Sequence, residues 1–190
     1  MVKYTQMITT AFLSPTTVSQ LTVGSEVAWN LPRAFWNLSF TASTVQPLIA
    51  VNNIATLSET NVTGQLLFSG WNTGSITGTL LGLEARVICR KSGRIRDRQI
   101  QLIVRGEAVG VNQGNAGISY FNTSLYDGSP DIPDATGDDT VYGAANSLWG
   151  STITAADLAS LQIAVRYQSG SMPHQDFAYC SAVYLRVTHQ

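Results

Sequence analysis

Apolar and polar residues alternate with a period of two along several stretches of the chain. In residues 83–90 one face carries Leu83, Ala85, Val87 and Cys89, and the other carries Glu84, Arg86, Ile88 and Arg90. The same alternation recurs in residues 98–105, 161–167 and 183–188. Because this is the repeat of a strand with one buried face, each stretch is predicted to be a β-strand.

The first two of these stretches are separated by Lys91-Ser92-Gly93-Arg94, a turn-like sequence, so residues 83–105 are predicted to form a β-hairpin. No stretch of ten residues or more has a convincing helical period. Thr154 and Asp157 stand at capping-box spacing and predict one short helical turn near 154–158. The expected fold is all-β, an antiparallel, jelly-roll-like β-sandwich.

The pattern indicates one domain, residues 31–190, preceded by a Thr- and Ser-rich segment, residues 1–30. We expect that segment to be an extended arm or an edge strand. Residues 122–147 contain three glycines, two prolines and five acidic residues, and are predicted to be a long exposed loop.

The composition is poor in charge. Charged residues make up 12% of the 190 residues, against about 25% in an ordinary soluble domain, and Thr and Ser are abundant instead. A net charge of −1 provides no general attraction to nucleic acid or to an anionic membrane. The chain has no apolar run as long as a membrane span and does not start like a signal peptide. Neither nucleic acid nor a membrane is therefore an expected partner.

Groups able to carry out catalysis are scarce. His174 and His189 are the only histidines, and no G-x-S-x-G motif accompanies them, so we expect no enzyme and no catalytic residues. Cys89 and Cys180 lack metal-ligand spacing; each is expected in a strand core, and they could pair only if their strands are neighbours. The acidic run 131–139 could bind a hard cation or simply be solvated, and the second is favoured. No metal or cofactor is expected.

The few charges are concentrated in two places. Seven of the eleven cations lie within residues 86–105, and five of the twelve acids lie within 127–139. Since Arg is common at interfaces, we expect either a contact between copies or a solvated surface. The residues expected at such a contact are Arg90, Lys91, Arg94, Arg96, Asp131, Asp134, Asp138 and Asp139.

Aromatic residues near predicted loops raise a second possibility, because flat rings stack on sugars. The candidates for binding a glycan are Trp71, Tyr126, Tyr142 and Trp149. Packing in the core is the commoner role of such residues.

A set of short motifs then resembles a known family. They are Ile76-Thr77-Gly78, residues 83–90, residues 97–102, Gly110-Val111-Asn112, Tyr142-Gly143, residues 148–158 and the final strand 178–187. Together they resemble a β-sandwich domain common among structural proteins of tailed bacteriophages.

The resemblance implies a virion component assembled in the host cytoplasm, most simply a capsid decoration (cement) protein. Such a protein would form a homotrimer and bind the major capsid protein. The alternative is a tail fibre or tail-tip module that contacts a tail protein and recognises host surface glycan. A glycan-cleaving enzyme is the least favoured of the three hypotheses.

Overall fold

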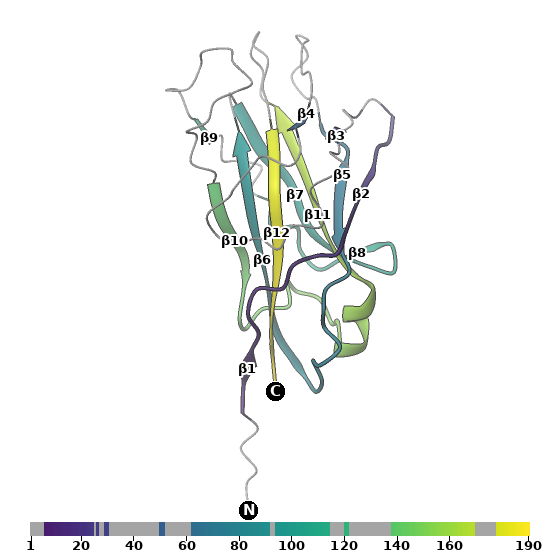
Figure 1. Cartoon of the computed structure of the whole chain (residues 1–190), viewed down its shortest axis with the longest axis vertical. Coiled ribbons are helices and arrows are strands. Elements are labelled where there is room, and N and C mark those ends of the chain that lie inside the picture. The colour runs from purple at the N-terminus through teal and green to yellow at the C-terminus, as the bar shows by residue number, and fades with distance from the viewer. Residues whose placement is uncertain are drawn as a thin grey trace, which may run out of the picture.

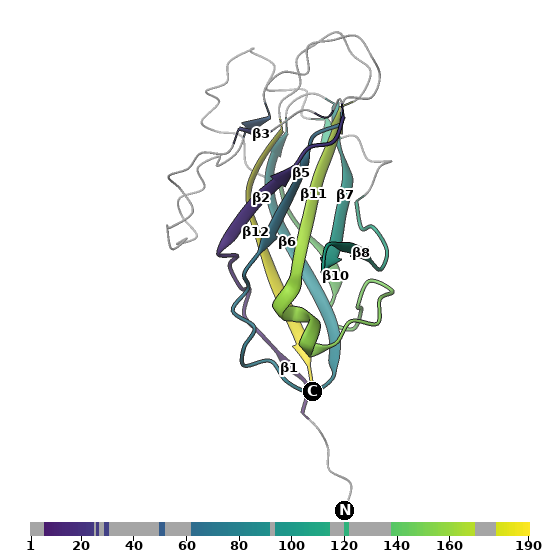
Figure 2. The same ribbon diagram turned by 90° about the vertical axis from the view of Figure 1, so that its right-hand side faces the viewer.

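The computed structural model is a sandwich of two antiparallel sheets, each with six strands. It describes residues 6–24, 26, 29–30, 50–51, 62–91, 94–114, 120–121, 138–169 and 178–190. At some strand ends only the backbone is described, including positions 89–91, 94–95, 138–139 and 181. Figures 1 and 2 show the sandwich in two views that differ by a turn of 90° about the vertical axis. The predicted all-β sandwich is confirmed.

The first sheet, sheet A, has the order β10-β6-β12-β4-β3, and β1 also pairs with β12. Its strands are β1 (Ile8–Thr9), β3 (Trp29–Asn30), β4 (Ala50–Val51), β6 (Leu80–Lys91), β10 (Asp138–Ala144) and β12 (Ala178–His189). The second sheet, sheet B, has the order β2-β5-β11-β7-β8, and β9 also pairs with β7. Its strands are β2 (Thr17–Leu21), β5 (Gln65–Ser69), β7 (Arg94–Val104), β8 (Glu107–Val109), β9 (Tyr120–Phe121) and β11 (Leu161–Ser169).

The chain changes sheet at most steps: β5, β7 and β11 lie in sheet B, whereas β6, β10 and β12 lie in sheet A. This alternation between two sheets is the connectivity of a jelly roll. It also shows that the predicted hairpin over residues 83–105 is wrong. The strands β6 and β7 are consecutive but belong to different sheets, so each finds its partners elsewhere.

The alternation correctly identified the buried faces of the long strands. Leu83, Ala85 and Val87 of β6 are buried against the other sheet, as are Ile100 and Leu102 of β7. The expected inward residues of β11 and β12 are buried as well: Leu161, Ile163, Val165, Tyr167, Val183, Leu185 and Val187. Burial of these apolar side chains between the layers is the main stabilising contribution to the fold.

The region expected to be a long loop, residues 122–147, is only partly one. Residues 138–144 form β10, which pairs along its whole length with β6, from Asp138 opposite Cys89 to Ala144 opposite Leu83. The sequence pattern did not predict this strand, because it is rich in acidic residues and contains a glycine. Such a composition is tolerated because β10 lies at the edge of sheet A, where one face needs no apolar residues.

The expected helical turn is present as the 3₁₀ helix η1 (Ala155–Ser160). Asp157 Oδ2 accepts hydrogen bonds from the backbone N–H of Thr154 at 2.9 Å and from its hydroxyl at 2.8 Å. These bonds fix the start of the turn, while Leu158 is buried in the core. Among the described residues, no helix is long and apolar enough to cross a membrane.

Candidate assembly interface

The N-terminal segment, residues 6–24, pairs with an edge of each sheet in turn. In sheet A, Ile8 and Thr9 pair with His189 and Thr188 of β12, and an isolated bridge joins Leu13 to Leu185. The segment then crosses to sheet B, where β2 pairs with β5 along its full length. Figure 1 shows this path in purple, running from one layer to the other.

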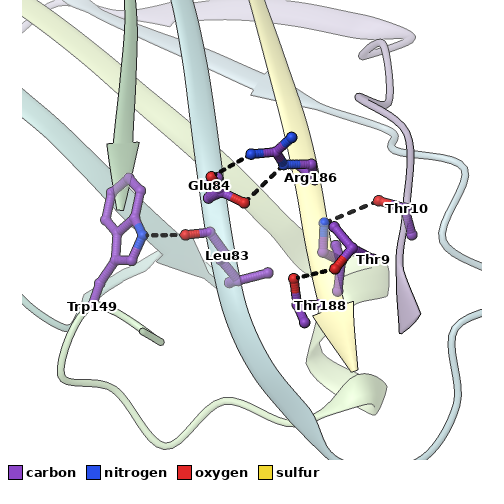
Figure 3. Close-up of polar contacts among 8 residues, drawn as sticks. Thr9, Thr10, Leu83, Glu84, Trp149, Arg186 and Thr188 are labelled. Atoms are coloured by element: carbon purple, nitrogen blue, oxygen red, sulfur yellow. Dashed lines mark hydrogen bonds and ion pairs between the residues drawn. The ribbon is translucent and has the colours of Figure 1, made fainter. Parts of the chain in front are cut away.

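Backbone hydrogen bonds provide most of the attachment to sheet A. Leu13 and Leu185 exchange both backbone bonds, at 2.6 and 3.0 Å, and Thr10 N–H donates to Val187 O at 2.9 Å. Threonine side chains add two more contacts. The hydroxyls of Thr9 and Thr188 lie 3.1 Å apart, and Val187 N–H donates to Thr10 Oγ1 at 3.0 Å (Figure 3).

A charged cluster on the outer face of sheet A holds the middle of the segment. Arg186 donates two hydrogen bonds to the Glu84 carboxylate, at 2.8 and 2.6 Å (Figure 3). The Arg186 guanidinium also lies 4.5 Å from the centre of the Phe12 ring, and Arg86 lies 5.7 Å from it. The hydrogen bond with Glu84 raises the pKa of Arg186. Cation–π contact therefore couples the segment to a bidentate ion pair of the sheet.

A second ion pair lies beyond the end of β2. Glu26 pairs with Arg166 of β11, and its other carboxylate oxygen accepts a hydrogen bond from Val23 N–H at 3.0 Å. Arg166 also donates to Thr63 O at 3.3 Å. Burial lowers the pKa of Arg166, and the adjacent carboxylate compensates its charge.

The same segment exposes apolar side chains. Met7, Ile8, Leu21 and Val23 have exposed fractions of 60%, 51%, 52% and 63%. Most of its other side chains are exposed too, so the backbone and a few contacts hold it rather than a buried face. Exposed apolar side chains on edge strands are a common feature of surfaces that bind other chains.

The charged residues predicted at a contact are only partly visible. Arg90 and Lys91 end β6, Arg94 and Arg96 begin β7, and Asp138 and Asp139 begin β10; Asp131 and Asp134 lie outside the described residues. Asp138 stands opposite Cys89, one residue from Arg90, in the β10/β6 register. The backbone of Asp138 thus lies beside the end of β6 within one chain. The expected contact between copies remains a prediction.

Three of the four aromatic candidates for binding a glycan lie in the core, which is the commoner role considered for them. Trp71, Tyr142 and Trp149 are buried in the core, and Tyr126 lies outside the described residues. Trp71 Nε1 donates to Leu161 O at 2.9 Å, and Trp149 Nε1 donates to Leu83 O at 2.8 Å (Figure 3). Each indole ring packs in the core and its N–H is hydrogen-bonded, so neither ring face is available to stack on a sugar.

The Tyr-Gly and Trp-Gly steps have a packing explanation. Gly143 has a φ of +84°, and a Cβ there would lie 2.2 Å from Trp149 Nε1 and 2.3 Å from Leu83 O. The missing side chain is therefore what lets the indole cross β10 to reach the backbone of β6. Trp149 itself has a φ of +58°, a backbone conformation that is rare for a bulky residue.

A buried polar contact joins the two sheets and was not anticipated from the sequence. Asp97 of β7 is fully buried and accepts a hydrogen bond of 2.6 Å from the Tyr142 hydroxyl of β10. The register against β11 shifts at this point, since Tyr167 faces Asp97 while Arg166 faces Gln99. Arg98 is the additional residue of this bulge and is exposed. A β-bulge changes the direction in which side chains point, and a bulge cannot be recognised from the period-two pattern of the sequence.

The described part of the chain contains no group of three or more His, Cys, Asp or Glu side chains placed to hold a metal. His189 is buried, with its Nδ1 2.9 Å from Thr77 O, and His174 lies outside the described residues. The N-terminal segment is therefore the surface feature that the geometry favours as a functional site.

No family model matches the chain, and no curated protein and no solved structure shows significant similarity to it.

Proposed function

We propose that this protein is a non-enzymatic structural component of a bacteriophage virion, a capsid decoration protein that stabilises the shell as a homotrimer. The observation that carries the proposal is the N-terminal segment. It binds both sheets by edge contacts and exposes Met7, Ile8, Leu21 and Val23 at the same time. A segment with this arrangement can pack against a neighbouring copy or a shell subunit.

The composition supports the same role. A surface rich in Thr and Ser, with 12% charged residues, loses less favourable hydration on being covered than one rich in Lys and Glu. The jelly roll is also compatible with such a role, although the fold alone does not specify a function. Three of the four side chains proposed for the glycan-binding alternative are buried in the core, so the decoration function is the better supported of the two.

The proposal is tested with phage particles assembled without the protein. Purified protein is mixed with these particles, and the bound amount is measured after sedimentation. We expect saturable binding and a higher temperature of DNA release from the decorated shells. Absence of binding to shells, with binding confined to isolated tails, would overturn the decoration function.

The contribution of the N-terminal segment is tested with the double variant Ile8→Asp/Val23→Asp. Burying either carboxylate in an apolar contact is costly, so binding to shells should weaken at least tenfold. Val111→Asp is the matched control, because Val111 is 60% exposed and lies by β8, far from β2. Equal loss of binding in both variants would show that the segment is not the interface.

The oligomeric state is tested by light scattering during size exclusion. A trimer has about three times the chain mass of 20.4 kDa. Charge reversal at Arg94 and Arg96 is expected to weaken the trimer more than it weakens the folded chain. If the trimer is unchanged by the charge reversal, the two arginines do not contribute to the contact between copies.

A further inference from the structure

The fold places the backbone positions of the two cysteines directly opposite each other. Cys89 and Cys180 are 91 positions apart in the sequence, but they are direct partners in the antiparallel ladder of β6 and β12. Figure 1 shows these two strands side by side in the middle of sheet A. The sequence left open whether their strands are neighbours, and the register answers that question.

Backbone hydrogen bonds around the ladder identify the type of pair. Leu185 exchanges both of its backbone bonds with Leu13, on the side of β12 away from β6. Leu83 likewise directs both groups away from β12, because its N–H donates to Ser147 O and its carbonyl accepts from Trp149 Nε1. The pairs that Leu185 and Leu83 form across β6 and β12 are therefore non-hydrogen-bonded pairs.

The same class extends to the cysteines. Along β6 the register with β10 runs without interruption from Leu83 to Cys89, so positions 83, 85, 87 and 89 alternate regularly. The register shift of β12 lies between Cys180 and Ala182 and so separates the cysteine pair from the Leu185 pair. The class of the cysteine pair is therefore taken from the uninterrupted alternation of β6. In a non-hydrogen-bonded pair the Cα atoms are about 4.5 Å apart and the side chains are at their closest. A disulfide requires Cα atoms about 4.4–6.8 Å apart.

Burial is described for Cys180, and the alternation of β6 predicts the same face for position 89. Cys180 is fully buried, and position 89 follows the buried residues Leu83, Ala85 and Val87 in the period-two series. Directly opposite residues of a ladder project from the same face of a sheet, which is the arrangement that a cross-strand disulfide needs.

We propose that Cys89 and Cys180 form a modification site, a cross-strand disulfide that closes on transfer of the protein from a reducing to an oxidising medium. With a low-molecular-mass disulfide as oxidant, one cysteine thiolate attacks it and releases one thiolate, forming a mixed disulfide. The second cysteine thiolate then attacks the protein sulfur and releases the second thiolate. Both protein thiols are oxidised, each losing its proton to solvent, and one small disulfide is reduced to two thiols.

The bond would join the two central strands of sheet A at the end where Asp138 begins β10 opposite Cys89. It would also close a loop of 91 positions in the unfolded chain, and long loops are where cross-linking restricts unfolded chains most. The inference does not depend on the proposed virion function.

The test uses the full chain, refolded from urea in mixtures of oxidised and reduced glutathione, so that burial of Cys180 does not limit access. Intact mass and peptide mapping should show loss of two hydrogen atoms and a Cys89–Cys180 linked peptide. The oxidised protein should unfold at a temperature at least about 5 °C higher than the reduced protein. Cys89→Ser and Cys180→Ser should each abolish this difference.

A matched control keeps the composition and moves one thiol out of register. The variant Cys180→Ser/Ser181→Cys places the cysteine at the position that the register skips. It should form at least tenfold less intramolecular disulfide than the wild type at the same glutathione ratio. Equal disulfide in both proteins, or linked wild-type protein that fails to regain the circular dichroism of the reduced fold, would overturn the proposal.

Discussion

At the residue scale, Gly143 and Trp149 illustrate a short motif with a steric cause. The indole of Trp149 passes over position 143 to donate its hydrogen bond to Leu83 O, and this leaves no space for a Cβ. The bond satisfies a buried carbonyl of β6 that would otherwise be costly. The motif therefore fixes the connection after β10 onto the central part of sheet A.

Gly143→Ala should destabilise the protein strongly, because it adds a clash to a φ of +84°. We expect a loss of about 2–4 kcal/mol in the free energy of unfolding, measured in urea. Gly74→Ala is the control, since a Cβ at that position meets nothing within 4 Å. A loss of similar size in both variants would refute the steric explanation.

Trp149→Phe tests the hydrogen bond separately from the packing. It keeps an aromatic ring in the core but leaves Leu83 O without the indole donor. An unsatisfied buried acceptor costs about 1–3 kcal/mol, and the urea midpoint should fall accordingly. An unchanged midpoint would show that water replaces the indole at no cost.

Asp157 gives a prediction for acid stability. The backbone and hydroxyl of Thr154 hold the pKa of this carboxyl below its ordinary 3.8, and Arg105 at 2.8 Å acts in the same direction. Because the folded-state pKa is the lower one, the stabilisation is present above about pH 3.8 and is lost as the pH falls through the folded value. Asp157→Asn should lower the melting temperature at pH 7, and the difference should shrink below pH 3.8. A difference independent of pH would contradict this.

At the element scale, the N-terminal segment is attached differently from the strands of the core. Its contacts are edge hydrogen bonds, the Phe12 ring against Arg186, and the ion pair between Glu26 and Arg166. Elements with few buried side chains open at lower free energy than the core. The segment should therefore open before the rest of the sandwich unfolds.

Phe12→Ala should loosen this segment while leaving the core nearly unchanged. Exchange of the Leu13 amide, which donates to Leu185 O, should accelerate at least fivefold, as followed by hydrogen–deuterium exchange. Leu21→Ala is the control, because that side chain is 52% exposed. An equal exchange rate of the Leu13 amide in the wild type and in Phe12→Ala would show that the Phe12 ring does not help to attach the segment.

At the scale of the whole molecule, residues 6–24 complete both sheets. Their removal would expose the edge of β5 and the edge of the C-terminal half of β12, both of which are paired in the intact chain. Unpaired edges template association with other chains.

Deletion of residues 1–24 should therefore lower the melting temperature and promote aggregation, measured by calorimetry and light scattering. Point substitutions on the segment are for this reason a cleaner test of assembly than a truncation. A truncated chain that stays monomeric with an unchanged melting temperature would show that the edges are covered in another way.

The sequence by itself determined the long strands β6, β7, β11 and β12 and their buried faces, because period-two alternation is local: Leu83, Ala85 and Val87 each reflect their own environment. It also determined the turn at Thr154 and Asp157, where both partners lie within four residues. These features depend on neighbours along the chain and can be recognised without knowing the topology.

Only the tertiary structure decided which strands pair, since pairing depends on contacts between distant segments. It separated β6 and β7 into different sheets, turned Asp97 inward through a bulge, and buried Trp71 and Trp149. It also placed Cys89 against Cys180. None of these outcomes has a local signature, because each depends on contacts between segments that are far apart in the sequence.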